Sequence, residues 1–130
     1  MIAAEIKVHP SGWLVKDEVV KDLIELKEIL DFTMIELEIN NAAMFSSRRN
    51  SDKVHTAKKV YLYLARMLTS KPLTEIGSMI NMDHGGVSLN LKVTKGFIDV
   101  NDEVFMNCLQ RVARIVKLVM KKKYETENQQ

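Results

Sequence analysis

Two short polar breaks divide the middle of this chain into three apolar segments, and their positions restrict the fold more than any other feature. The first break is Ser70-Lys71-Pro72, where proline lacks a backbone donor and disfavours helical angles in the residue before it. The second is Asn81-Met82, followed by Asp83, whose carboxylate is suited to cap a new helix. Three short helices in this order, with Gly77 near the end of the middle one, are typical of a helix-turn-helix.

The flanking sequence predicts more helix and no strand. Apolar residues recur at helical spacing from Lys16 to about Met44, so we expect one long amphipathic helix there. The segment from Phe45 to His55 is polar, basic and turn-prone, and we expect it to form a loop. The remaining helices are predicted at residues 56–68, 73–80, 84–95, where Gly96 ends the segment, and 101–122.

The length and composition fit one compact helical body. With 130 residues, of which 46% are hydrophobic, the chain can bury one core and is too short for two ordinary domains. We expect an all-α fold with an N-terminal amphipathic arm at 1–45, a helix-turn-helix domain at 46–124 and a disordered tail at 125–130. No apolar run reaches the roughly 18 residues that cross a bilayer, and no secretion signal is seen, so we expect a soluble, cytoplasmic protein.

Charge is distributed unevenly along the chain. Residues 1–45 carry four Lys/Arg and nine Asp/Glu, a balance of −5. Residues 46–96 carry nine against three, which is +6, and residues 97–130 carry six against five, which is +1, so the sum is the net charge of +2. The positive charge therefore collects on the helix-turn-helix segment, which suits a polyanionic partner.

Enzymatic sites find little support in the sequence. His9, His55, His84 and Cys108 lack the spacing of metal ligands, and neither a Gly-rich phosphate loop nor a nucleophile elbow occurs. We therefore expect a protein that is not an enzyme and that has no catalytic residues, metal, cofactor or small-molecule substrate. Cys108 lies at helical spacing among apolar residues, so we expect it to be a buried small hydrophobe.

The start of the third helix carries side chains suited to reading bases. In a helix-turn-helix this helix lies in the major groove, and its N-terminal residues contact base edges. The carboxylate of Asp83 can accept from a cytosine amino group, and the imidazole of His84 can donate to a base acceptor or touch a thymine methyl. Double-stranded DNA is therefore the expected partner, and the protein would be nucleoid-associated when DNA-bound.

The same segment resembles the C-terminal, origin-binding domain of the bacterial replication initiator DnaA. The resemblance covers roughly residues 56–116. The residues that fall in register are Leu64-Ala65-Arg66, Leu68-Thr69, Leu73, Glu75-Ile76-Gly77, Asp83-His84 and Val87. This resemblance implies a Trp-repressor-like helix-turn-helix that binds duplex DNA.

The resemblance also implies roles for individual residues. Base reading is implied for Asp83 and His84, with Gly85 and Gly86 standing at two further base-reading positions. Phosphate contacts are implied near Arg66 and Leu73, and we extend this expectation to their neighbours and to the basic residues of the third helix: Lys71, Thr74, Lys92 and Lys95. The basic loop before the motif is expected to enter the minor groove through Arg48, Arg49 and Lys53.

The sequence departs from the family pattern at the helix that reads DNA. Met82 stands where the family has Arg, and Gly85-Gly86 replace paired hydroxyl residues. Two glycines in a helix cost on the order of 1 kcal/mol each relative to alanine. These departures leave two readings open: a DNA-binding regulator or replication-associated protein, or a helical protein-interaction adaptor that kept the fold but lost base reading.

The N-terminal helix is a candidate for self-association. Its apolar stripe comprises Val19, Leu23, Leu26, Leu30 and Leu37 and is widened by Ile24, Ile35 and Ile39. Either the whole stripe packs on its own chain, or part of it meets a second copy or a helical protein partner. Its acidic flank is expected to keep it away from DNA.

Overall fold

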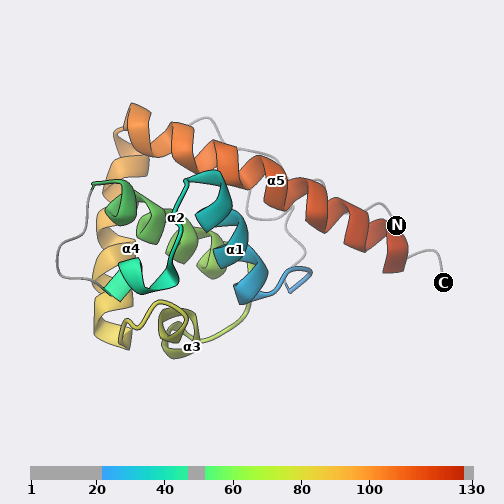
Figure 1. The fold of residues 1–130 in the computed structure, drawn as a ribbon, viewed down its shortest axis with the longest axis horizontal. Coiled ribbons are helices and arrows are strands. Elements are labelled where there is room, and N and C mark those ends of the chain that lie inside the picture. Colours follow the sequence, from blue (N-terminus) through green and yellow to red (C-terminus); the bar gives the residue numbers. More distant parts are fainter. Residues whose placement is uncertain (1–21, 47–51, 128–130) are drawn as a thin grey trace.

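The computed structural model describes residues 22–46 and 52–127, and helices are the only regular elements in these ranges (Figure 1). In chain order they are α1 (Leu26–Glu36), the 3-10 helix η2 (Ala42–Ser46), α2 (Asp52–Leu68), α3 (Leu73–Ser78), α4 (His84–Asp99) and α5 (Glu103–Glu127). The predicted all-α fold with a helix-turn-helix is confirmed. None of the described helices is long and apolar enough to span a membrane.

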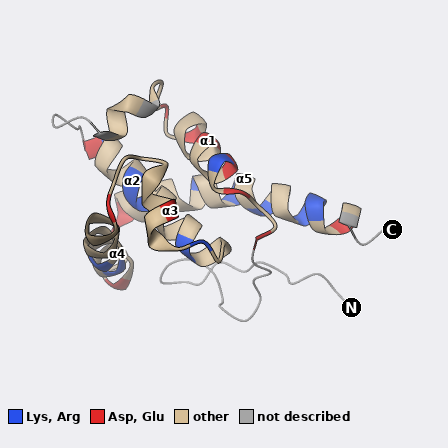
Figure 2. Ribbon diagram, turned by 90° about the horizontal axis from the view of Figure 1, so that it is seen from below, with Lys and Arg blue, Asp and Glu red and all other residues tan. Residues whose placement is uncertain are grey.

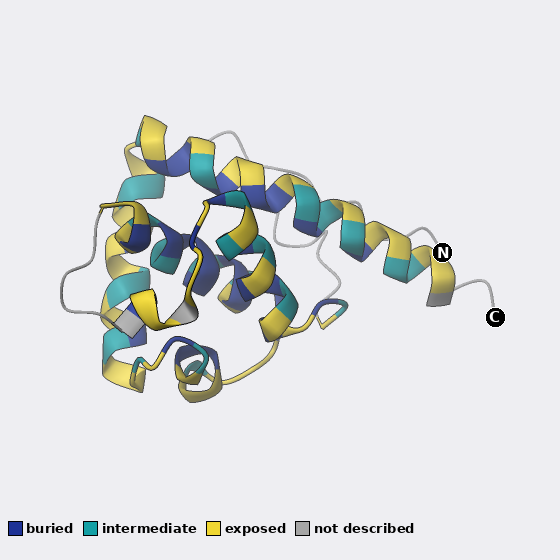
Figure 3. Cartoon of the chain, in the orientation of Figure 1, coloured by how far each residue is buried: buried dark blue, intermediate teal, exposed yellow. Residues whose placement is uncertain are grey.

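Helix α2 is the centre of the molecule. It contacts every other α-helix, and Figure 3 shows buried residues recurring along its ribbon. Its fully buried side chains include Val60, Leu64 and Leu68, which recur at helical spacing. The remaining helices pack around α2, so a single core underlies the whole helix-turn-helix.

The predicted long N-terminal helix is wrong in its extent, because the described helix spans only Leu26–Glu36. Its start is fixed by a capping box, in which Glu25 and Glu28 each accept a backbone N–H of the other. Beyond its end, Glu38 adopts a left-handed φ of 58°, which breaks the helix. The apolar pattern continued past this point because Leu37 and Ile39, on either side of Glu38, are buried in the core. The predicted start at Lys16 lies outside the described residues.

Helix α1 belongs to the common core rather than to a separate arm. Ile24 and Leu30 are buried in the same cluster as the side chains of α2 and α5. Charged groups also join α1 to α5: Glu28 pairs with Lys123, and the Arg111 guanidinium donates to the Glu36 carbonyl at 2.8 Å. This packing favours the reading in which the stripe serves its own chain.

Only Ile35 of the described stripe residues is left well exposed, with 70% of its surface accessible. An association through this helix therefore has little apolar surface to use in the described part of the chain. The division into an arm at 1–45 and a domain at 46–124 stays a prediction. Because α1 packs in the common core, we propose that the folded unit includes α1.

Three further helix boundaries differ from the expectation. Helix α2 begins at Asp52, so residues 52–55 are helical where a loop was expected. The Asp52 carboxylate in the first turn interacts favourably with the helix dipole. Helix α4 continues through Gly96 to Asp99 and is followed by Asn101 at a left-handed φ of 54°. Helix α5 extends to Glu127, beyond the predicted end.

Two side chains of α5 differ from their expected burial. Val104, in the first turn, is exposed although it recurs with the apolar residues of the helix. Cys108 is half-buried at the edge of the core rather than fully enclosed. Burial nevertheless raises the pKa of the Cys108 thiol.

Helices α3 and α4 approach each other most closely at Gly77. A Cβ at this position would lie 2.2 Å from the Met82 carbonyl oxygen and 2.6 Å from Val87 Cγ2. The Met82 N–H donates to the Gly77 carbonyl at 2.9 Å, which closes the turn between the helices. The Tyr61 hydroxyl of α2 donates to the Ile76 carbonyl at 2.8 Å and so fixes α3 on α2. Gly77 is therefore a point of close approach between α3 and the start of α4.

We predict opposite effects for alanine at two glycines. Gly77→Ala should lower the free energy of unfolding by about 1–3 kcal/mol, because backbone atoms block the new Cβ. Gly96→Ala should raise it by up to about 1 kcal/mol, because nothing lies within 4 Å of the added Cβ and alanine favours helix. Urea unfolding at low protein concentration measures both changes. Equal stabilisation by the two substitutions would contradict the close approach.

Candidate nucleic-acid interface

The front of α4 is fixed by its cap. Asp83 has extended backbone angles, and its Oδ1 accepts the Gly86 N–H at 2.7 Å, which confirms the predicted N-cap. One carboxylate oxygen is thus committed to the helix. Asp83 itself remains exposed.

The two glycines that follow have different surroundings. A Cβ at Gly85 would meet only Asp83 Oδ1, at 3.8 Å, so this position is open. A Cβ at Gly86 would lie 2.8 Å from Met82 Cγ, so the methionine side chain occupies the space that a larger residue would need. Met82 and Gly86 therefore fit each other, while Gly85 simply leaves a gap on the exposed surface.

One side of α4 carries a polar and basic strip. His84, Ser88, Lys92 and Lys95 are exposed and follow one another at intervals of four, four and three residues. This spacing places them on one side of a helix. Val87 and Thr94, on another side of the helix, are fully buried and hold the helix on the core. We call these four exposed residues the polar strip.

Ser88 is the member of the polar strip that we did not single out from the sequence. Its hydroxyl lies one turn behind His84 and can both donate and accept. The sequence signal for Ser88 is that it follows His84 by four residues and so lies on the same side of the helix. This signal can be used only when the exposed side of the helix is known. Ser88 offers a hydroxyl close to the two positions where this chain has glycine.

The other expected DNA-contacting residues lie near the ends of α2 and α3. Arg66 is exposed in the last turn of α2, and Thr74 is exposed in the first turn of α3. Lys71 is exposed and lies 3.8 Å from the Glu75 carboxylate, a surface pair that offers little net stabilisation. Leu73 is half-buried.

Of the three expected minor-groove residues, only Lys53 lies within the described ranges. Arg48 and Arg49 are outside the described residues. Lys53 is exposed in the first turn of α2 and lines an open hollow together with Asp31 and Glu38. Its role in the minor groove stays a prediction.

Lys59 of α2 packs against α4, and Lys58 precedes it in the chain. The Lys59 ammonium lies 5.5 Å from the centre of the Phe97 ring, and this ring lies 5.9 Å from that of Phe105 on α5. Burial lowers the pKa of Lys59, while burial and the nearby Lys59 charge lower the pKa of Lys58. These contacts tie α2, α4 and α5 together, which favours a structural role for Lys59 over contact with phosphate.

Charged residues of both signs are spread over the described surface. Figure 2 shows basic segments on α2 and α4 and along α5, with acidic segments among them. Within the described ranges, no group of three or more His, Cys, Asp or Glu side chains is placed to hold a metal ion. The polar strip is therefore the clearest candidate site in this part of the chain.

The arrangement of these helices agrees with a comparison with known protein families. The family described as bacterial dnaA protein helix-turn-helix matches residues 26–93. The chain belongs to this family. The match begins at α1 rather than at α2, and it ends within α4, so it starts earlier and ends earlier than the resemblance seen in the sequence. The inclusion of α1 agrees with its place in the core.

A curated relative supports the same assignment. The chain is similar to the chromosomal replication initiator protein DnaA of Campylobacter curvus (strain 525.92), with 32% identity over 93 residues. The aligned region covers 71% of this chain and 20% of the relative, so the chain spans about a fifth of that protein's length. No solved structure matches the chain.

We predict that the Asp83 cap contributes measurably to stability. Asp83→Ala should lower the free energy of unfolding by about 0.5–2 kcal/mol, because the Gly86 N–H loses its acceptor. Asp83→Asn should retain most of the stability, because its amide oxygen can also cap the helix. Urea unfolding distinguishes the two variants. An equal loss in both would show that charge, rather than the hydrogen bond, matters at this position.

Proposed function

We propose that this chain binds double-stranded DNA with the front of α4 in the major groove. The observation that carries the proposal is the polar strip, which is exposed on a helix whose cap and buried side are fixed. Membership in a helix-turn-helix family supports it, because such folds place the N-terminal residues of this helix against bases.

Each residue of the strip has a chemical role in this proposal. His84 contacts a base edge, and the second oxygen of Asp83 accepts from a cytosine amino group. The Ser88 hydroxyl contacts a base or a phosphate, and Lys92 and Lys95 neutralise phosphates further along the groove. Gly85 and Gly86 contribute only their backbone, so the number of base-reading side chains is small.

The ends of α2 and α3 complete the proposed contact with the DNA backbone. Arg66, Lys71 and Thr74 offer charged or hydroxyl donors to phosphates, and the chain at Leu73 approaches the backbone. Arg48, Arg49 and Lys53 are proposed to enter the adjacent minor groove. Similarity to a chromosomal replication initiator protein favours a replication-associated role for this chain over that of a small regulator.

A protein-interaction adaptor is the second candidate. The observation that favours it is the exposed apolar surface along α4 and its C-cap, where Leu89 and the C-cap residue Val100 are both solvent-exposed. Apolar side chains on a helix that faces DNA contribute little to phosphate contact. The salt dependence of binding separates the two candidates, because an apolar contact is far less sensitive to salt than a phosphate contact.

We predict salt-sensitive binding to duplex DNA with modest sequence preference. Phosphate contacts outnumber base-reading side chains in the proposed interface, so release of counterions should dominate the affinity. Affinity should fall by at least about tenfold between about 50 and 200 mM salt, measured by electrophoretic shift on genomic fragments. Binding that is absent at the lower concentration, or unchanged at the higher one, contradicts the proposal.

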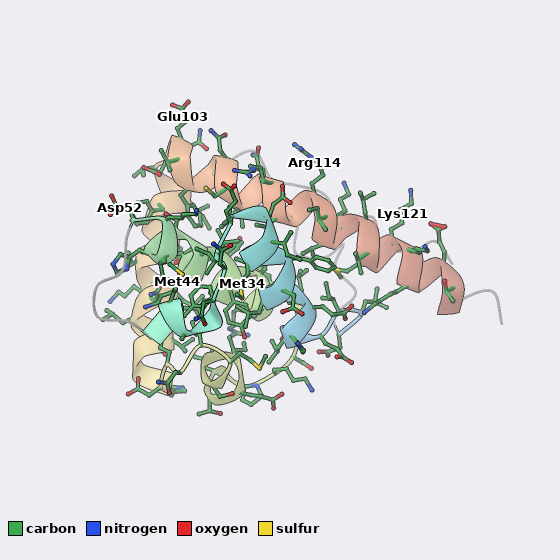
Figure 4. The ribbon with its side chains drawn as sticks, viewed as in Figure 1. Met34, Met44, Asp52, Glu103, Arg114 and Lys121 are labelled. Carbon is green, nitrogen blue, oxygen red and sulfur yellow. The ribbon has the colours of Figure 1, made fainter. Side chains whose placement is uncertain are left out.

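We predict that His84→Ala and Arg66→Ala differ in kind. Loss of the His84 base contact should cost about 1–3 kcal/mol at preferred sites and little elsewhere, whereas loss of the Arg66 phosphate contact should weaken all sites alike. Arg114→Ala is the matched control for charge, because Arg114 is exposed and projects from the outer side of α5 (Figure 4). Uniform, equal losses from the first two variants in binding titrations would place His84 outside the groove.

A further inference from the structure

A second exposed strip of α4 is apolar. Leu89, Val93 and Val100 expose 65%, 45% and 74% of their surface, and Gly96 is exposed between them. Helix α4 forms one edge of the molecule, and exposed segments recur along it in Figure 3. These four residues, which we call the apolar strip, are more exposed than a monomer requires of a helix that already packs on a core.

The spacing of the apolar strip is that of a coiled-coil seam. The four residues follow at intervals of four, three and four, the alternation of the a and d positions of a heptad. Val100 keeps the helical register, because its N–H donates to the Gly96 carbonyl at 3.1 Å. A Cβ at Gly96 would meet nothing within 4 Å, so another helix can approach closely at this point.

We propose that the apolar strip binds the apolar strip of a second copy of this chain, with the two α4 helices antiparallel. In this pairing Val93 of each copy faces Gly96 of the other, and Leu89 of each faces Val100 of the other. In each facing pair the smaller side chain, Gly96 or Val100, thus lies against the larger one, Val93 or Leu89. The pairing uses one surface twice and closes as a two-fold dimer.

The charges beside the strip select the antiparallel direction. Lys92 and Asp99 are both exposed and lie seven residues apart, at equivalent positions flanking the seam. An antiparallel pair brings Lys92 of each copy near Asp99 of the other, which gives two ion pairs by symmetry. A parallel pair would instead place Lys92 beside Phe97, which carries no charge.

The short seam makes this dimer weak. It spans about three helical turns, and a standard protein interface buries roughly 1,600 Å² in total. We expect monomers at low protein concentration and dimers only when the protein is concentrated. Because Lys92 belongs to the polar strip and also flanks the apolar strip, the dimer withdraws a phosphate-contacting residue from DNA. This last consequence rests on the proposed function.

Sedimentation of the intact chain without DNA tests the seam. Leu89→Gln should raise the dimer dissociation constant by at least about tenfold, because each dimer loses two buried leucines. Leu118→Gln is the matched control and should leave the constant unchanged, because Leu118 is 64% exposed on α5, away from the seam. A chain that stays monomeric when concentrated, or equal effects of the two variants, overturns the proposal.

Charge reversal tests the direction of pairing. Lys92→Glu alone and Asp99→Lys alone should each weaken the dimer, because each places like charges across the seam. An equimolar mixture of the two variants should associate better than either alone, because opposite charges then face each other between chains. No recovery in the mixture overturns the antiparallel arrangement.

Addition of a DNA duplex separates this proposal from the proposed function. If DNA binding and dimer formation both use Lys92, duplex DNA should lower the dimer fraction. A DNA complex in which the two α4 helices stay paired overturns the proposed competition between DNA and the second copy. A chain that does not bind DNA contradicts only the proposed function, since the sedimentation results without DNA are independent of it.

Discussion

The contact at Gly77 is the constraint on which the proposed site depends. The Met82 carbonyl and the Val87 side chain occupy the space where any larger residue would place its Cβ. This contact brings the turn before α4 against α3, and the hydrogen bond from Tyr61 to the Ile76 carbonyl fixes α3 on α2. The direction of α4 relative to the core therefore follows from one missing side chain and one buried hydroxyl. Burial raises the pKa of that hydroxyl, so it remains protonated and donates at all ordinary pH values.

The departures from the family pattern are physically coupled rather than independent. Met82 packs over Gly86, so a hydroxyl residue at position 86 would displace the methionine side chain. Gly85 has no such constraint, and its Cβ position is open. In the proposed interface, position 86 therefore holds a packing contact and position 85 is open, so neither offers a side chain to bases. The capped helix is kept, because the Gly86 N–H donates to Asp83.

Signals that act within a few residues could be predicted from the sequence, whereas those that depend on distant packing could not. The break at Pro72 and the cap at Asp83 are local, and both were predicted. The end of α1 depends on Glu38, which adopts a left-handed conformation that non-glycine residues seldom take. A glutamate at this position gives no sequence signal for a turn. In the site, Asp83 and His84 followed from motif order. Ser88 was missed because its relevance depends on which side of α4 the core leaves exposed.

The helices that position the site extend beyond the helix-turn-helix. Helix α5 begins after the last residue of the family match, yet Leu109, Val112 and Val116 are fully buried against the other helices. Full burial of one such side chain contributes roughly 1.5–3 kcal/mol. Three of them together already compare with the whole net stability of a small domain, about 5–15 kcal/mol. Because α5 contacts α1, α2 and α4, its loss would release the surfaces that fix the direction of α4. The unit that presents a capped helix to a ligand is therefore the shared core of α1, α2 and α5, and the helix-turn-helix is the part of that unit that the ligand would meet.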